Sequence, residues 1–149
     1  MGNRFTDEDK FQDKWYRNLS IKHKILWEYL VCNCDIAGFF KIDYDLMTFY
    51  VGEEIKEEDL DTLKEKIEFI KDDLIFIPNF ILFQQKVNSI KELNINNNCH
   101  KGILKILDKY KSKDLLPKNI KLPNIQINDF KKQKNNSSKD ELLRRMMDD

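Results

Sequence analysis

A run of four apolar residues at 74–77 limits the folds open to this chain, because it has the length and the boundaries of a buried strand. An Asp-Asp pair, typical of a turn, comes directly before the run, and a Pro-Asn pair ends it. The partly alternating residues 67–71 lie on the other side of the turn. We therefore predict a β-hairpin over residues 67–77.

Apolar residues recur at helical spacing through most of the chain before this hairpin. Ser20 and Asp43 each stand where an N-cap belongs, directly before such a segment. Gly52 ends the second segment as a glycine ends many helices. The elements expected before the hairpin are a helix at 11–19, a helix from Ser20 to about Cys34, a turn at 35–38, a strand at 39–42, a helix from Asp43 to Gly52 and a helix from about Glu57 to about Lys66.

Two helices, a short strand, two more helices and a hairpin follow one another in the order of a winged helix-turn-helix. In that fold the third core helix can enter the major groove of DNA, and the hairpin, or wing, touches the backbone beside it. The predicted fold class is mainly α, a winged helix-turn-helix with a small β-hairpin and a flexible C-terminal tail.

The pattern changes after the hairpin. A basic helix is expected around residues 101–111, and beyond it Pro, Lys and Asn dominate, as in a linker. Ser138 and Glu141 then have the spacing of a capping box before a short apolar patch. So short a helix is unstable alone in water and would fold on a partner; the alternative is a disordered end. The predicted organisation is a winged-helix domain at 5–112, a flexible linker at 113–138 and a short amphipathic tail at 139–149, whose partner-binding residues are Leu142, Leu143, Met146 and Met147.

Charge is unevenly distributed along the chain. Lys and Arg number 26, as do Asp and Glu, so the net charge is zero. Residues 43–73 nevertheless hold twelve acidic and four basic side chains, whereas residues 84–134 hold twelve basic and four acidic ones. Separated fields of this kind can steer a charged partner to one face of a neutral protein.

Two groups of residues are candidates for contact with double-stranded DNA. The first group lies on the third core helix, where side chains that suit contact with bases or phosphates stand among acidic residues. The alternative interpretation of this group is a solvent-exposed helix surface that contacts no DNA. The second is a lysine block that suits phosphates; the alternative is the lysine-rich surface typical of a low-GC genome. The candidates are Thr62, Lys64 and Lys66 in the first group, and Lys86, Lys91, Lys101, Lys105, Lys109, Lys111 and Lys113 in the second.

Several other classes of site are not expected. Cys32, Cys34, Cys99 and His100 lack the paired spacing of zinc knuckles, so we expect no metal and place the thiols in or near the core. Seven aromatic residues stand at core spacing, and we expect most of them inside the protein: Trp15, Trp27, Phe39, Phe40, Phe49, Phe76 and Phe80. The sequence contains no nucleophile–base pair and no glycine-rich phosphate loop, which argues against an enzyme and against a bound cofactor.

The chain is expected in the cytoplasm of a host cell. The three cysteines cannot all pair, which favours a reducing compartment. No run approaches the roughly 18–20 apolar residues that a membrane span needs, and the N-terminus lacks the apolar region of a secretory signal.

A string of core and turn residues over about residues 10–110 carries a resemblance to a known family. It consists of these short segments, in chain order: Lys14-Trp15, Leu19-Ser20, Lys24-Ile25-Leu26-Trp27, Tyr29-Leu30, Asn33-Cys34-Asp35-Ile36-Ala37-Gly38, Ile42-Asp43, Phe76-Ile77-Pro78-Asn79-Phe80-Ile81, Phe83-Gln84 and His100-Lys101-Gly102-Ile103-Leu104.

This string resembles the winged-helix N-terminal region of phage replisome organisers, the DnaD-like replication initiation proteins of phages and mobile elements. The resemblance implies origin DNA binding and recruitment of a helicase or its loader. The sequence departs from it in charge, because the third core helix is acidic and the wing carries the Asp-Asp pair where Lys or Arg is usual.

Two functions therefore stay open. The first is a DNA-binding module of phage replication initiation, which the resemblance favours. The second is a phage-encoded inhibitor, such as an anti-CRISPR protein, whose acidic face occupies the basic cleft of a host nucleic-acid enzyme; the acidic third helix favours it. The oligomeric state is not readable from the sequence.

Overall fold

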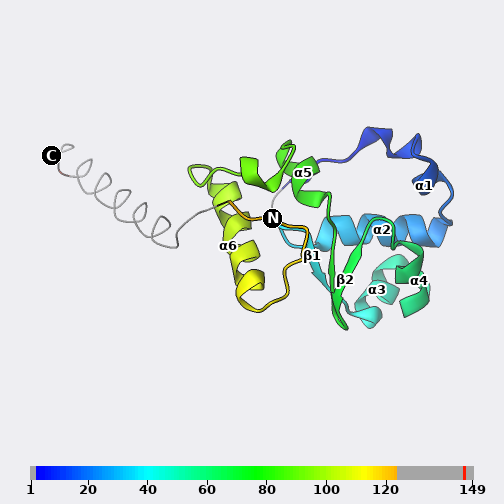
Figure 1. Cartoon of the computed structure of the whole chain (residues 1–149). Coiled ribbons are helices and arrows are strands. Elements are labelled where there is room, and N and C mark those ends of the chain that lie inside the picture. The colour runs from blue at the N-terminus through cyan, green and yellow to red at the C-terminus, as the bar shows by residue number, and fades with distance from the viewer. Residues whose placement is uncertain (1–2, 124–145, 147–149) are drawn as a thin grey trace.

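A computed structural model describes residues 3–123 and residue 146 of the 149-residue chain. This part of the chain is mainly helical and contains a small three-stranded antiparallel sheet. The elements, in chain order, are η1 (Glu8–Phe11), α1 (Lys14–Arg17), α2 (Ile21–Asn33), β1 (Phe39–Lys41), α3 (Tyr44–Val51), α4 (Glu57–Thr62), β2 (Glu68–Lys71), β3 (Leu74–Phe76), α5 (Phe80–Gln85), η2 (Ile90–Glu92) and α6 (Asn98–Ser112) (Figure 1).

The helix ends predicted from capping residues are confirmed. Ser20 is the N-cap of α2 and its Oγ accepts a hydrogen bond from the His23 N–H at 3.2 Å. Asp43 caps α3 in the same way, with its Oδ1 3.0 Å from the Leu46 nitrogen. Gly52 ends α3 with a φ of 86°, a left-handed conformation that glycine adopts without steric cost.

The predicted hairpin is confirmed, and the strand predicted near residue 40 joins it. The strand order is β1-β3-β2, with Phe40 and Phe69 both opposite Ile75 on the central strand. A register shift interrupts the β2–β3 ladder between Phe69 and Lys71, next to the turn.

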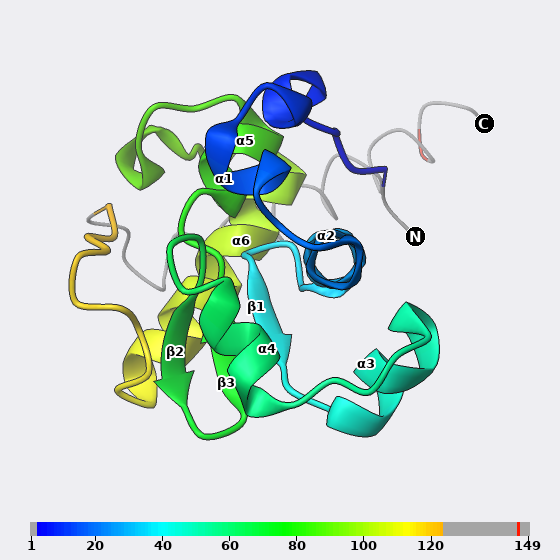
Figure 2. The ribbon, with the colours of Figure 1, turned by 90° about the vertical axis from the view of Figure 1, so that its right-hand side faces the viewer.

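The sheet separates two core clusters. The first core cluster lies on the side of α2, α3 and α4, and the second lies on the side of α6 (Figures 1 and 2). Alternation along β3 places Ile75 in the first cluster and Leu74 and Phe76 in the second, so the central strand is buried on both faces. Buried members of the first core cluster include Leu26, Leu30, Met47, Leu60 and Leu63, and those of the second include Phe39, Ile81, Ile103, Leu104 and Leu107.

The turn between α2 and β1 depends on a glycine. The Asp35 carboxylate accepts hydrogen bonds from the N–H groups of Ala37 (2.9 Å) and Phe39 (3.0 Å). Gly38 has a φ of 89°, and a Cβ added there would lie 3.0 Å from both the Ile77 carbonyl oxygen and the Phe80 Cβ. The turn therefore combines a left-handed backbone with close contact to the start of α5.

Three element boundaries differ from the sequence prediction. The helix predicted at 11–19 is divided into η1 and α1, because the Asp13 side chain accepts the Trp15 N–H at 2.8 Å and begins a new helix. Helix α4 ends at Thr62 rather than near Lys66, since the chain turns there to bring both Leu63 and Ile67 into the core before β2. The apolar residues 80–83, for which the sequence predicts no element, are part of helix α5.

Residues just after α6 pack against the domain. Leu116, Ile120 and Leu122 are half-buried against the second core cluster, although they fall within the range predicted as a linker. Residues 124–138 of that linker and the tail residues Leu142, Leu143 and Met147 lie outside the described residues, and Met146 is exposed. No helix within the described residues is long and apolar enough to span a membrane.

Candidate nucleic-acid interface

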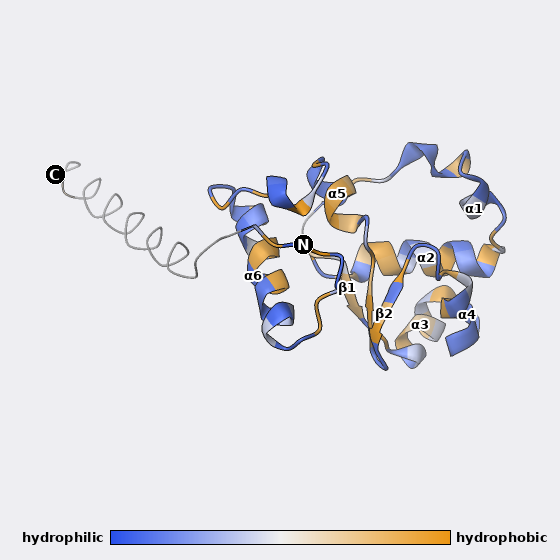
Figure 3. Cartoon of the chain, in the orientation of Figure 1, coloured by the Kyte–Doolittle hydropathy of each residue, from blue (hydrophilic) through white to orange (hydrophobic). Residues whose placement is uncertain are grey.

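Helix α6 presents a lysine face away from the core. Asn97 caps the helix by accepting the N–H groups of Cys99 (2.9 Å) and His100 (3.2 Å). The apolar residues of one side are buried against the sheet, and the alternation of apolar and polar residues is visible in Figure 3. Lysines recur every four residues on another side of the helix, which places them in one row. We call this row the α6 lysine face, and its members are Lys101, Lys105 and Lys109.

The α6 lysine face is accessible over much of its length. Lys105 and Lys109 are exposed, and Lys101 is half-buried. Lys111, two residues after Lys109 and therefore on a different side of the helix, is also exposed, and Asp108 is the one acidic residue of α6. A row of lysines whose Cβ atoms are about 6 Å apart suits the phosphates of one nucleic-acid strand.

The structure does not bring the two predicted DNA-contacting groups onto one surface. Helix α4 packs on the first core cluster through Leu60, and its C-cap Leu63 joins the same cluster, whereas α6 packs on the second through Ile103 and Leu107. The sheet stands between the two helices (Figure 1). Contacts by α6 and contacts by α4 therefore belong to different sides of the protein.

The candidate residues around α4 are largely engaged within the protein. The Thr62 hydroxyl donates to the Glu58 carbonyl oxygen at 3.2 Å. Lys66 Nζ lies 3.8 Å from an Asp13 carboxylate oxygen and 5.5 Å from the centre of the Trp15 ring. Lys64 is exposed.

Of the lysines of the predicted block that lie outside α6, only Lys113 stands at the spacing of the row. Lys86 ends α5 with a φ of 53°, and its Nζ lies 4.7 Å from the centre of the Phe5 ring, in cation–π geometry. Lys91 and Lys113 are exposed, the first on η2 and the second directly after α6.

The outer surface of α4 and the turn of the β2–β3 hairpin is acidic, as the sequence indicates. Glu57, Glu58 and Asp61 are exposed on the helix. Asp72 is exposed at the turn of the hairpin, where Asp73 lies 3.8 Å from Lys71 Nζ. Like charge on this side would repel phosphates and attract a basic partner.

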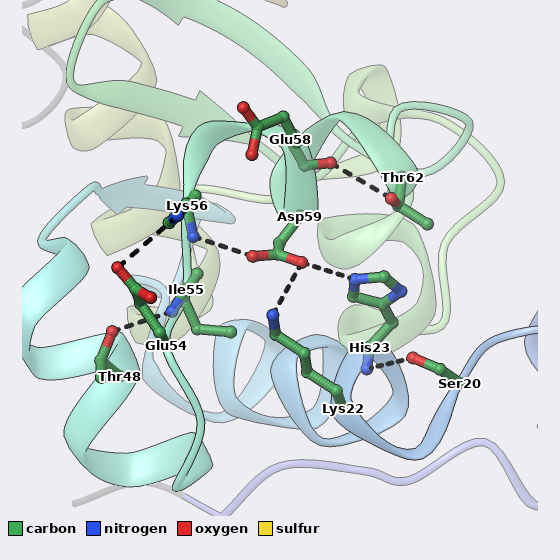
Figure 4. A network of polar contacts seen from close by, with 10 residues as sticks. All are labelled: Ser20, Lys22, His23, Thr48, Glu54, Ile55, Lys56, Glu58, Asp59 and Thr62. Carbon is green, nitrogen blue, oxygen red and sulfur yellow. Dashed lines mark hydrogen bonds and ion pairs between the residues drawn. The ribbon is translucent and has the colours of Figure 1, made fainter.

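Asp59 is the exception among these acids, because it faces inward to α2 (Figure 4). One carboxylate oxygen lies 2.8 Å from His23 Nε2 and 3.1 Å from Lys22 Nζ, and the other accepts the Lys56 N–H at 2.8 Å. Partial burial acts to raise the pKa of Asp59, but the hydrogen bonds from His23, Lys56 and Lys22 outweigh it and lower the pKa to about 2. His23, which stands between two lysines in the sequence, is part of this network.

The N-terminal residues form an arm across α2 and α5 that sequence reasoning missed. Arg4 donates to the backbone oxygens of Val31 (2.9 Å) and Cys34 (2.6 Å), at the end of α2. The backbone of Phe5 and the Gln84 side chain exchange two hydrogen bonds, both of 2.8 Å. The arm carries no periodic apolar pattern and is held by polar contacts, so the sequence offers little signal for it.

A cavity of about 230 Å³ lies between the arm and the domain. Its walls include the rings of Trp15 and Trp27, which meet edge to face at 5.3 Å, and the Lys10–Glu28 ion pair. Two of the charged groups in the walls of this cavity, Lys10 and Glu28, are thus paired with each other.

The cysteines are divided between core and surface. Cys34 is buried, and burial raises the pKa of its thiol to about 11, although Arg4 Nη1, 3.2 Å from the sulfur, acts in the opposite direction. Cys32 and Cys99 are exposed, so the expectation that all three thiols lie in or near the core is wrong for these two. Among the described residues, no group of three or more His, Cys, Asp and Glu side chains could hold a metal ion.

One aromatic residue predicted in the core lies outside it. The Phe49 side chain is 76% exposed on α3. Helical periodicity identifies α3 but not its solvent side, because apolar residues occur on more than one side of this helix.

Comparison of the sequence with protein-family models matched no family, and comparisons with curated proteins and with solved structures also found no match.

Proposed function

We propose that this protein is a winged helix-turn-helix protein of a phage or mobile element that binds double-stranded DNA in the host cytoplasm during replication initiation. The element order from α2 to β3, with strand order β1-β3-β2, supports the winged helix-turn-helix assignment. The role in replication rests on the sequence resemblance to phage replisome organisers.

The single observation that carries DNA binding is the α6 lysine face. In this proposal Lys101, Lys105, Lys109 and the neighbouring Lys111 contact phosphates of the duplex. Helix α4, with its acidic surface, is not the main contact, so the protein binds DNA through the side of the sheet opposite α4.

A mobility-shift series on duplex DNA tests the proposal. Four phosphate contacts predict that affinity falls roughly 10²-fold between about 50 mM and about 200 mM salt. Absence of binding at the lower salt concentration, or binding that salt does not weaken, contradicts the proposal.

The tail belongs to the same proposal as the contact to a helicase or helicase loader. Its residues Leu142, Leu143, Met146 and Met147 would supply the apolar side of a helix that docks in a groove. Deletion of residues 139–149 is expected to leave DNA binding intact and to abolish recruitment of the loader in a reconstituted assay; unchanged recruitment contradicts this role.

A second candidate function is favoured by the acidic α4 and wing. In that case the exposed acids occupy a basic cleft of a host nucleic-acid enzyme in place of its substrate. A pull-down from host lysate is then expected to recover such an enzyme, and Glu57→Lys, Glu58→Lys and Asp61→Lys together are expected to release it. Recovery that survives the charge reversal contradicts this function.

A further inference from the structure

Helix α3 presents apolar side chains to solvent. Leu46 is 49% exposed, Phe49 76% and Tyr50 62%, at the helical spacing i, i+3, i+4. Only Met47 and Val51 of this helix are buried. Single exposed apolar residues are ordinary, but a contiguous group of this kind marks an interaction site.

The exposed rings on α3 are held in place by their neighbours. Tyr50 stacks on Tyr29 of α2 at 5.4 Å between ring centres, with 20° between the planes, and Phe49 meets Tyr50 edge to face at 5.1 Å. Tyr29 in turn packs edge to face at 5.9 Å on Phe40, a buried member of the first core cluster. A partner would therefore meet rings that lose little freedom on binding.

The apolar surface continues onto α2. Ile25, one helical turn before Tyr29, is 42% exposed. We call this surface the α3 patch, and its members are Ile25 and Tyr29 of α2 with Leu46, Phe49 and Tyr50 of α3.

The charge on the α3 side of the patch has one dominant sign, whereas Lys22 and Lys24 stand near Ile25 on α2, where Lys22 Nζ is paired with Asp59. Asp43 and Asp45 stand at the start of α3, and Glu53 and Glu54 directly follow its end; all four are exposed. Between residues 43 and 58 the only basic side chain is Lys56, and its Nζ lies 3.8 Å from Glu54. Figure 3 shows α3 in hydrophobic colours beside the largely hydrophilic α4.

We propose that the α3 patch is a docking site for a basic amphipathic helix of another protein, which places apolar side chains on Phe49 and Tyr50 and Lys or Arg side chains against the acidic rim. Apolar anchors on helical spacing fit the exposed row of α3. Charge complementarity selects a basic helix and disfavours an acidic one.

This site does not depend on the proposed DNA binding. The α3 patch and the α6 lysine face lie on opposite sides of the sheet (Figures 1 and 2). A protein partner and a nucleic acid can therefore be bound at the same time.

The probe for this site is a labelled synthetic helix of roughly 14 residues made of leucine and lysine, followed by fluorescence anisotropy on the full chain. A peptide with glutamate in place of lysine is expected to bind at least about tenfold more weakly. Phe49→Ser is expected to weaken the lysine peptide about tenfold, and Glu53→Lys with Glu54→Lys several-fold. Phe69→Ser, which removes another exposed ring on β2, is the matched control and is expected to change nothing.

Two results overturn the proposal directly: the lysine peptide does not bind, or Phe49→Ser and Phe69→Ser bind it alike. Sedimentation of the protein without peptide can give a third contradicting result. If the protein is a dimer and Phe49→Ser dissociates it, a second copy of the chain, rather than a basic helix, covers the patch. A photo-crosslinking group on the peptide makes the test independent of the variants' stability. Crosslinks at residues 44–54 support the site, and crosslinks confined to other segments contradict it.

Discussion

The carboxylate of Asp59 lies 2.8 Å from the imidazole Nε2 of His23 and thereby joins the first turn of α4 to the first turn of α2. Lys22 and the Lys56 backbone complete the network. One inward-facing acid thus fixes the angle at which the otherwise acidic α4 stands on the domain.

Replacing Asp59 is expected to destabilise the fold in a pH-dependent way. Its pKa is about 2 in the folded protein against an ordinary value of 3.8. A lowered folded pKa means that the carboxylate stabilises the fold above about pH 4 and that this contribution is lost as the pH falls toward about 2. Asp59→Asn is expected to lower the free energy of unfolding by about 1–2 kcal/mol at neutral pH, measured in urea.

The difference between wild type and Asp59→Asn should shrink between about pH 4 and about pH 2. Asp61→Asn, two residues away and exposed, is the control and is expected within about 0.5 kcal/mol of wild type. A stability difference that stays constant down to about pH 2 would show that the charge of Asp59 is not what stabilises this junction.

Two left-handed glycines are expected to differ in their tolerance of alanine. Gly38→Ala introduces a Cβ at 3.0 Å from a backbone oxygen, whereas the same change at Gly52 meets nothing within 4 Å. We expect a loss of about 1 kcal/mol for Gly52→Ala, from backbone strain alone, and about 2–3 kcal/mol for Gly38→Ala. Urea unfolding measures both, and equal losses contradict the close approach at Gly38.

The thiols are expected to react in two classes. In the native protein a thiol reagent such as Ellman's reagent should modify Cys32 and Cys99 rapidly, while Cys34 reacts only on unfolding, because it is buried and its pKa is raised to about 11. Cys34→Ala should leave the rapid phase unchanged, and Cys32→Ser or Cys99→Ser should each remove half of it. Rapid reaction of all three thiols at neutral pH would contradict the burial of Cys34.

Charge reversal on α6 is expected to change the salt dependence of DNA binding. Lys105→Glu with Lys109→Glu removes two exposed cations of the α6 lysine face, so the slope of log affinity against log salt should fall by about 2. Lys41→Glu with Lys56→Glu changes the net charge by the same amount at exposed positions outside α6 and serves as the control. Equal effects of the two pairs would mean that net charge, rather than the α6 lysine face, determines the affinity.

Local signals in the sequence predicted much of the fold. Ser20, Asp43 and Gly52 act through their own neighbouring backbone, so their positions alone locate the helix ends. The hairpin followed from a turn pair and an apolar run, which are equally local features.

Features that depend on distant parts of the chain were not predictable in the same way. The pairing of Lys66 with Asp13 requires the placement of α1 beside α4, and the exposure of Phe49 requires knowing which side of α3 meets α2. The α6 lysine face and α4 are separated because α6 packs on one side of the sheet and α4 on the other. The sequence does not indicate on which side of the sheet α6 packs.

The burial of β3 on both faces has a consequence for how the protein unfolds. Its side chains point alternately into the first and the second core cluster, so detachment of β3 would expose both clusters to solvent. The described body should therefore melt as one cooperative unit, and the amide hydrogens of β3 should be among the last to exchange with solvent.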